Sequence, residues 1–248
     1  MSRVVCRFSC GVASAVAVKL ALAKHRDGEV VITRSDTGAE HPDNERFMAD
    51  CERWFGQSIT VQKSTRFRDT FDVWERERFI VSAWGSSCTD ELKRVPSEAM
   101  IRPTDTLVFG YTAGEERRAA RLRAANIDQF IETALIEAGL TKADCHAIIE
   151  RAGIQLPMMY RLGYHNNNCI GCPKGGKGYW NKIRRDFPDT FERMAALQRE
   201  LGPGSGFHIH SGKRITLDDL PLDAGNHTGE VQPECSILCL IASQDFAA

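Results

Sequence analysis

Two serines and a glycine lie where a short apolar segment gives way to a helical pattern, and this arrangement can bind phosphate. Residues 4–8 are apolar apart from one arginine and predict a buried strand. Ser9, Cys10, Gly11 and Ser14 follow, and residues 15–25 have helical periodicity. Backbone N–H groups at a helix start bind anions, serine hydroxyls add donors, and glycine allows close approach. An ordinary strand-to-helix turn is the alternative interpretation.

Cysteine is the second residue type that could do chemistry, and the chain has nine. Cys169 and Cys172 form a C-x-x-C pair in a Gly/Asn-rich loop, and Cys88 lies on a separate predicted loop. Cys235 and Cys239 are near the end of the chain. Without an export signal, we expect thiols, metal ligands or catalytic groups rather than disulfides. Three cysteines in apolar patterns are predicted to be core: Cys6, Cys51 and Cys145.

Alternating strands and helices must position these residues. Apolar runs at 29–33, 59–61 and 106–110 predict three further buried strands, separated by helical patterns. We therefore predict an α/β fold with a doubly wound, mostly parallel sheet and helices on both faces. Ligands bind such sheets at the carboxyl ends of the strands. The loops at this edge add Asp36, Thr37, Gly38, Gly110, Glu116, Arg117 and Arg118 to the candidate site.

Two of these loops also have plain structural interpretations. Asp36 to Gly38 could be a simple turn, and the charged run 115–118 could be a solvated helix face. Elsewhere, an amphipathic pattern predicts a helix over 71–84 and a loop follows at 85–89. Thr141 and Asp144 form a capping box for a helix through 151, and Pro188 is expected to break a helix over 179–201.

Length and composition limit how many domains the chain can form and where the protein can be located. A chain of 248 residues with 42% hydrophobic content can form one large α/β domain with an extension. We predict a nucleotide-binding domain over 1–165 and a C-terminal extension, packed on it, over 166–248. No segment is apolar enough to span a membrane and no signal peptide is recognisable, so we expect a cytoplasmic protein. The formal charge of −1 gives no overall attraction to nucleic acid.

Four short segments, in this order, resemble the phosphoadenosine phosphosulfate reductase family of the adenine-nucleotide alpha-hydrolase (PP-loop) superfamily. They are residues 8–16, 36–40, 88–93 and 110–118, and the resemblance extends to about Cys235. It implies a PP-loop fold that binds an adenine nucleotide, whether ATP, adenosine phosphosulfate or phosphoadenosine phosphosulfate. The phosphates would lie on the first loop and the base near the second strand.

One departure separates this loop from those of ATP-splitting members of the superfamily. Those enzymes usually have a lysine and an aspartate where this chain has Val12 and Ala13. Without them, stabilisation of charge on a pyrophosphate under cleavage is weaker. The sulfonucleotide reductases also lack the pair, so this loop is more similar to theirs.

The resemblance also implies a role for the cysteines. Related reductases that use adenosine phosphosulfate bind a four-iron four-sulfur cluster through a cysteine pair near Cys88 and a C-x-x-C near Cys169. Here Ser87 precedes Cys88, so three ligands match, and Cys235 or Cys239 could be the fourth. An open iron site is a further option. Zinc is the alternative metal, because thiolates select both and spacing does not separate them.

The tail offers a second role for Cys235. Glu234 and Cys235 resemble the Glu-Cys-Gly-Leu/Ile-His tail of the reductases, whose cysteine attacks the sulfonucleotide. The glycine and histidine are missing here, since Ser236 and Ile237 follow. Alternatively, Cys235 and Cys239 are buried small hydrophobic residues or the remaining metal ligands.

A basic stretch with two aromatic residues runs from Lys174 to Arg185. It could attract a phosphate-rich substrate or a nucleic-acid strand. The alternative is a solvated helix with Tyr179, Trp180 and Ile183 packed inward.

Three functions are consistent with these observations. The preferred one is a sulfonucleotide-reductase-like oxidoreductase of sulfur metabolism, with Cys235 as nucleophile and thioredoxin or glutaredoxin as reductant. The second is an ATP-dependent sulfurtransferase that adenylates and thiolates a nucleic-acid or nucleotide acceptor. The third is a nucleotide-binding regulatory module without turnover. A homodimer is compatible with all three.

Overall fold

The chain folds into two compact units that alternate along the sequence. The computed structural model describes residues 3–82 and 85–230. Unit 1 comprises the described residues up to Asp36, together with His41–Ser64 and Lys93–Asn167. Unit 2 comprises Thr37–Glu40, the described residues of Thr65–Leu92, and those from Asn168 onward. The division into domains at 1–165 and 166–248 remains a prediction, and Cys235 and Cys239 lie outside the described residues.

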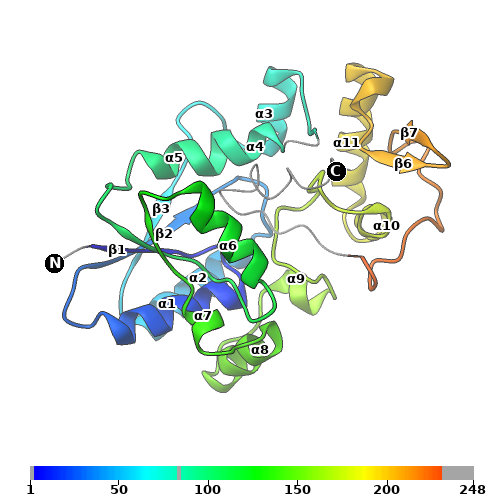
Figure 1. Cartoon of the computed structure of the whole chain (residues 1–248). Helices are drawn as coiled ribbons and strands as arrows, with labels where there is room; N and C mark the ends of the chain where they lie inside the picture. Colours follow the sequence, from blue (N-terminus) through cyan, green and yellow to red (C-terminus); the bar gives the residue numbers. More distant parts are fainter. Residues whose placement is uncertain (1–2, 83–84, 231–248) are drawn as a thin grey trace. The chain divides into compact units, whose positions relative to one another are not determined.

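A five-stranded parallel sheet organises unit 1 (Figure 1). Its strands, in spatial order, are β3 (Ile59–Gln62), β2 (Val30–Ser35), β1 (Val4–Arg7), β4 (Thr106–Val108) and β5 (Phe130–Glu132). The strand order reverses at β1, which pairs with β2 on one side and β4 on the other. This is the predicted doubly wound sheet, and the reversal is where such sheets bind ligands. The edge strand β5 is not predicted from the sequence, because it is short and Phe130 is largely exposed.

Most helices of unit 1 lie in segments with helical periodicity, whereas the one-turn helices Ala134–Glu137 and Met158–Arg161 are not predicted from the sequence. The helices of this unit are α1 (Val12–Lys24), α2 (Asp43–Phe55), α5 (Val95–Glu98), α6 (Glu116–Ala125), α7 (Ala134–Glu137), α8 (Lys142–Arg151) and α9 (Met158–Arg161). The Thr141–Asp144 capping box is present at the start of α8, as predicted. None of the helices in residues 3–82 and 85–230 is long and apolar enough to cross a membrane.

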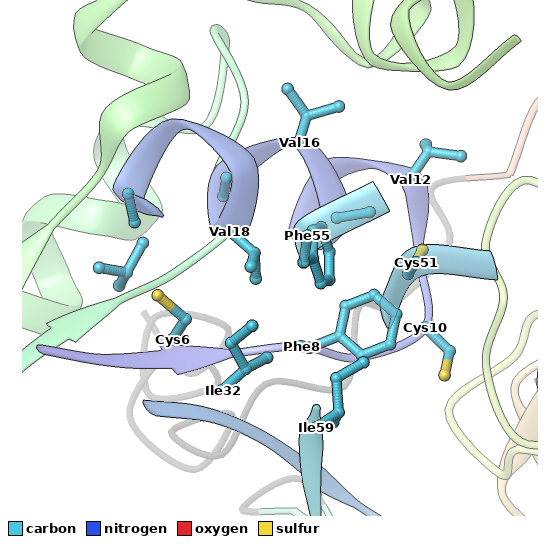
Figure 2. Close-up of a cluster of buried hydrophobic side chains, with 14 of the residues drawn as sticks. Cys6, Phe8, Cys10, Val12, Val16, Val18, Ile32, Cys51, Phe55 and Ile59 are labelled. Carbon is cyan, nitrogen blue, oxygen red and sulfur yellow. The ribbon is translucent and has the colours of Figure 1, made fainter. Parts of the chain in front are cut away.

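The main core lies between α1, α2 and one face of β1. Figure 2 shows the Phe8 ring among these side chains, with Cys6 and Ile32 nearby. The Phe8 ring stacks on Phe47 with 6.2 Å between centroids and meets Phe55 edge-on at 5.9 Å. This packing holds the end of β1 rigidly against the helices, so that the loop after Phe8 leaves the sheet at a defined place.

The opposite face of β1 is also covered. Arg7 interrupts the apolar run of the strand because it points away from Cys6 and Phe8. Its guanidinium is buried and donates a hydrogen bond to Ser97 Oγ in α5. Burial lowers the pKa of Arg7 to about 10. Helices therefore pack on both faces of the sheet, as the doubly wound fold requires.

The three cysteines predicted as core are buried. Desolvation raises the pKa of Cys6 to about 12 and that of Cys145 to about 11, and it raises the pKa of Cys51 as well. Because the thiolate is the nucleophile and the metal ligand, these three thiols are inert. Any nucleophilic or metal-binding thiol of the chain is therefore expected among the other cysteines.

Unit 2 is mostly helical. Its elements are α3 (Thr70–Glu77), α4 (Ser87–Thr89), α10 (Lys177–Asp186), α11 (Pro188–Leu201), a 3₁₀ turn (Pro203–Ser205) and the antiparallel strands β6 (His208–His210) and β7 (Lys213–Ile215). A π-helical turn, Asp90–Arg94, leads from α4 into α5. The predicted break at Pro188 separates α10 from α11.

Two predictions in this region are wrong. The helix expected over 71–84 ends at Glu77, because Arg78 adopts a left-handed conformation (φ 55°) that closes the helix. The segment 85–89, expected to be a loop, contains the short helix α4. Residues 83 and 84 lie outside the described part.

A carboxylate from the end of the described chain binds the start of α10. Glu230 accepts hydrogen bonds from the backbone N–H groups of Gly178 (2.7 Å) and Tyr179 (3.0 Å). The approach requires glycine: a Cβ atom at Gly176 would lie 2.4 Å from Glu230 Oε2, and one at Gly178 would lie 2.4 Å from the backbone of His227. This packing explains Gly176 and Gly178 of the basic stretch.

Replacing Gly110 by alanine is expected to destabilise unit 1. A Cβ atom at Gly110, just after β4, would lie 2.7 Å from Ser14 N and 2.8 Å from Ser14 Cα in the first turn of α1. Backbone atoms must shift to relieve this overlap, so we expect a loss of about 1–3 kcal/mol in the free energy of unfolding, measured with urea. Gly204→Ala is the control, since nothing lies within 4 Å of a Cβ there. Equal unfolding midpoints for the two variants would contradict this contact.

Candidate functional site

Ser14 closes the loop between β1 and α1 on itself. Its Oγ accepts a hydrogen bond from Ser9 N (3.1 Å), lies 3.2 Å from Ser9 Oγ, and donates to Gly11 O at 2.8 Å. Ser14 is buried and Ser9 is exposed. The loop is thus shaped by its own hydroxyls, and Ser9 remains accessible to a ligand.

The start of α1 lacks the groups that usually neutralise a helix N-terminus. Gly11 is its N-cap and forms no side-chain cap, and the first turn has no acidic residue. By contrast, the side chains of Asp69 and Thr141 cap α3 and α8. Helix α10 also begins after a glycine without a cap, and there Glu230 supplies an anion. The N-terminus of α1 is therefore suited to an anion, and among residues 3–82 and 85–230 neither a side-chain cap nor a first-turn carboxylate provides one.

Only the backbone of Cys10 is available to contact a ligand. Its side chain is fully buried in the core, and its backbone adopts positive φ (55°), which is rare for a non-glycine residue. The carbonyl oxygen of Cys10 accepts a hydrogen bond from Asn167 Nδ2 at 2.7 Å. This contact helps to hold the unusual turn.

The loop after β4 lies against the start of α1, as the close approach of Gly110 to Ser14 demonstrates. Arg118 is held in place by Glu115, whose Oε1 is 2.8 Å away, and by the Tyr111 ring, whose centroid is 5.0 Å from the guanidinium carbon. Arg117 is exposed. Helix α6 thus carries one ordered cation, Arg118, and one exposed cation, Arg117.

Glu116 has a structural contact of its own. Its carboxylate accepts a hydrogen bond from Gly114 N at 2.9 Å, and this bond lowers the pKa of Glu116. Its charge therefore persists at neutral pH and helps to form the start of α6.

The loop after β2 is divided between the two units. Asp36, in unit 1, pairs with Lys63 at 2.8 Å. Thr37 and Gly38 belong to unit 2, where Thr37 Oγ1 lies at hydrogen-bond distance, 3.0 Å, from Cys169 Sγ. The structure thus groups the serines and Gly110 in unit 1, whereas Thr37 lies with the C-x-x-C loop.

Three half-buried thiols belong to unit 2: Cys88, Cys169 and Cys172. Cys88 Sγ lies 3.1 Å from Ser86 Oγ, so Cys88 and Cys169 each have a hydroxyl neighbour. Within residues 3–82 and 85–230, however, no three His, Cys, Asp or Glu side chains come together as metal ligands. The described thiols by themselves do not form the predicted cluster or zinc site.

Tyr179 organises the C-x-x-C loop. Its hydroxyl accepts hydrogen bonds from the backbone N–H groups of Gly171 (3.0 Å) and Cys172 (3.1 Å), and it donates one to Cys169 O at 3.2 Å. Burial, and secondly the neighbouring Cys172, raise the pKa of Tyr179 well above its usual value. The hydroxyl therefore stays protonated and remains a donor.

Sequence reasoning did not identify Asn167 or Tyr179 as site residues. Asn167 is one of three successive asparagines, and nothing local distinguishes it from its neighbours. The sequence predicts Tyr179 either as part of a basic stretch that binds phosphates or nucleic acid, or as a side chain packed inward. Its ring packs inward, but its hydroxyl reaches back seven to ten residues, and a pattern of residue types does not reveal such a bond.

The basic stretch forms contacts within unit 2. Lys182 pairs with Asp186 at 2.9 Å. Arg184 donates to the carbonyl oxygens of Leu217 (3.2 Å) and Leu220 (3.0 Å). Tyr179, Trp180 and Ile183 are buried, as the structural interpretation predicted. Nucleic-acid binding by this stretch stays a prediction.

Comparison with known proteins identifies a matching family model and a solved structure with a similar fold. The family model described as "Phosphoadenosine phosphosulfate reductase domain" matches residues 3–175. Among the solved structures that match is the phosphoadenylyl-sulfate (PAPS) reductase of Candida auris in a phosphate complex, 12% identical with a TM-score of 0.50. The match covers 68% of this chain and 81% of that one. At this identity the structural similarity shows the fold. A search of curated proteins finds no match.

Replacing Tyr179 by phenylalanine is expected to loosen the C-x-x-C loop. The ring is kept, but two N–H groups and one carbonyl lose their partner, which costs about 1–3 kcal/mol for buried groups. We expect Cys169 and Cys172 to be alkylated by iodoacetamide several-fold faster, as measured for each cysteine by mass spectrometry. Tyr164→Phe, at a buried tyrosine of unit 1, is the control. Unchanged alkylation rates in Tyr179→Phe would show that its hydroxyl does not order the loop.

Proposed function

Because the chain belongs to the phosphoadenosine phosphosulfate reductase family, we propose that it binds an adenine sulfonucleotide through the loop of residues 9–14. In this proposal, it is a sulfonucleotide-reductase-like enzyme of sulfur metabolism. The single observation that carries the proposal is the start of α1, which has no side-chain cap and no acidic residue in its first turn. A phosphate or sulfate group is the anion that such a helix start accepts.

Several neighbours support phosphate binding at this place. Ser9 is exposed and can donate its hydroxyl. Gly110 brings the loop after β4 against Ser14, and Arg118, eight residues further along the chain, is held by Glu115. A guanidinium that is already ordered loses less side-chain entropy when it binds an oxyanion. Arg117 adds a second positive charge.

The first turn of α1 favours a sulfonucleotide over ATP cleavage. Val12 is fully buried in the core, and Ala13 packs against it. The lysine and aspartate that ATP-splitting relatives carry at these positions are thus replaced by packing groups. The sulfurtransferase alternative would require charge stabilisation from elsewhere.

In the proposed reaction, the thiolate of Cys235 attacks the sulfur of the sulfonucleotide. The bond from that sulfur to the phosphate oxygen breaks, and the adenosine phosphate leaves with the electron pair. A dithiol reductant such as thioredoxin or glutaredoxin then cleaves the new sulfur–sulfur bond, releasing sulfite and becoming a disulfide. Cys235 lies outside the described residues, so its part rests on the similarity of its tail to those of the reductases.

The iron–sulfur cluster remains a prediction, with zinc as its alternative. Its support is that Cys88, Cys169 and Cys172 are half-buried thiols of one unit. As described, they do not gather as a three-ligand set, and Cys235 and Cys239 lie outside the described residues. The proposed binding and attack therefore use no metal-dependent step.

A carboxylate introduced in the first turn of α1 is expected to weaken sulfonucleotide binding. Ala13→Asp places a negative charge where the helix dipole favours it, so the stability of the fold should not fall. In ATP-splitting relatives a lysine accompanies the aspartate, but this chain has Val12 there, so the new charge is uncompensated and repels a bound phosphate. We expect at least about tenfold weaker binding of adenosine phosphosulfate or its 3′-phosphorylated form. Isothermal titration calorimetry of the wild type and the variant measures this difference.

Ala13→Asn is the matched control, because it has nearly the same shape without the charge. We expect it to bind within about threefold of wild type, and the loss in Ala13→Asp to shrink at high salt. If Ala13→Asp binds as tightly as Ala13→Asn, the phosphates do not lie at the start of α1. If the wild type binds neither sulfonucleotide, the proposed function is wrong.

The two tail cysteines separate catalysis from binding. Cys235→Ser should lose sulfite release while binding the sulfonucleotide as the wild type does, because its thiol acts only in the chemical step. Cys239→Ser should retain sulfite release. Sulfite production with a thioredoxin system and a binding titration of each variant provide the readouts. Full turnover in Cys235→Ser would remove Cys235 as the nucleophile, whereas binding without sulfite release in the wild type would favour the regulatory module.

A further inference from the structure

Asn167 occupies an unusual position beside the loop of residues 9–14. It is buried, and its Nδ2 donates one hydrogen bond to Cys10 O (2.7 Å) and another to Asn44 Oδ1 (2.7 Å). Both neighbours are oxygen acceptors when Asn44 is oriented this way, which identifies the atom between them as the amide nitrogen. Both amide protons are therefore used.

The other end of the same amide is left with nothing to accept. Asn167 Oδ1 is buried and has no hydrogen-bond partner within residues 3–82 and 85–230. A buried acceptor without a donor is costly and rare in folded proteins. The cost arises at the same turn as the positive φ of Cys10, a second unfavourable feature. Unfavourable features that coincide in this way are typical of binding sites.

We infer that Asn167 is a residue of the nucleotide site, with two functions. Its amide nitrogen holds the Cys10 carbonyl and so keeps the loop in shape. Its Oδ1 accepts a hydrogen bond from the bound nucleotide. This inference rests on the proposed function and extends it to the nucleoside.

The chemistry of the ligand limits which group can be the donor. Phosphate and sulfate oxygens of a sulfonucleotide are ionised at neutral pH and only accept hydrogen bonds. The donor must therefore belong to the nucleoside, as a ribose hydroxyl or the 6-amino group of adenine. Asn167 thus recognises the nucleoside, whereas the start of α1 recognises the anion. A site that pairs a donor of its ligand discriminates against analogues that lack it.

The test is a double-mutant cycle between the protein and its ligand. The wild type and Asn167→Ala are titrated with whichever binds more tightly, adenosine phosphosulfate or its 3′-phosphorylated form. The same titrations use counterparts without the 2′-hydroxyl, without the 3′-hydroxyl where it is free, or without the 6-amino group. In the wild type, we expect one of these deletions to weaken binding by about three- to tenfold. In Asn167→Ala, the same deletion should cost less than about twofold.

Asn167→Asp keeps an acceptor and loses the amide donors, so it separates the two functions. It should bind more weakly overall, yet still discriminate against the same analogue. If Asn167→Ala does not fold, this variant and the wild type together still test the acceptor. Circular dichroism checks the fold of each variant.

The outcomes are distinct. If a sulfonucleotide binds the wild type but each ligand deletion weakens binding equally in the wild type and in Asn167→Ala, Asn167 has no role in recognition. The proposed function is then left intact. The same holds if Asn167→Asp loses the discrimination. If no sulfonucleotide binds the wild type, the proposed function and this inference fall together.

Discussion

The arrangement of unit 1 depends on the backbone N–H groups at the start of α1. A parallel sheet brings the carboxyl ends of its strands to one edge, and the reversal of strand order at β1 opens that edge beside the first helix. The helix begins at Val12 without a cap or an acidic neighbour. Elsewhere the chain supplies such a group, as Glu230 does for α10. Both helices begin after a glycine without a side-chain cap, but in the described part of the chain a carboxylate is seen only at the start of α10. This contrast underlies the functional interpretation.

Keeping that helix start open imposes costs that other parts of unit 1 offset. Cys10 adopts a conformation that suits glycine, and the packing of its thiol in the core together with the bond from Asn167 holds it there. Gly110 must lack a side chain so that the loop after β4 can lie against Ser14. The stacked rings of Phe8 and Phe47 fix the strand that precedes the loop. Rigid surroundings therefore maintain a turn that is unfavourable in isolation.

The parts of this structure that sequence could predict are those with local signals. Alternating apolar runs predicted four of the five strands of the main sheet, and the capping box at Thr141 and the break at Pro188 were correct. The short strand β5 was missed, since three residues with an exposed phenylalanine carry little periodicity. The early end of α3 depends on the left-handed turn at Arg78, a residue with no particular preference for it.

The residues of the candidate site also differ in whether a local sequence signal predicts them. Ser9, Gly11 and Ser14 were evident because strand, turn and helix follow one another directly, and Gly110 could be placed at the same sheet edge. Asn167 and Tyr179 were not evident: the amide of Asn167 meets a carbonyl 157 residues earlier in the chain, and the Tyr179 hydroxyl bonds to backbone groups of a preceding loop. Such contacts depend on tertiary structure. The same holds for Thr37, which lies beside Cys169, 132 residues away.

The most direct test of the central claim is a nuclear magnetic resonance titration of backbone amides with adenosine phosphosulfate or its 3′-phosphorylated form. If phosphate groups bind the start of α1, the amide resonances of Gly11, Val12, Ala13 and Ser14 shift most. Amides at the start of α8, where Thr141 already caps the helix, should move little. Largest shifts at the basic stretch from Lys174 to Arg185, with none in residues 11–14, would contradict the account.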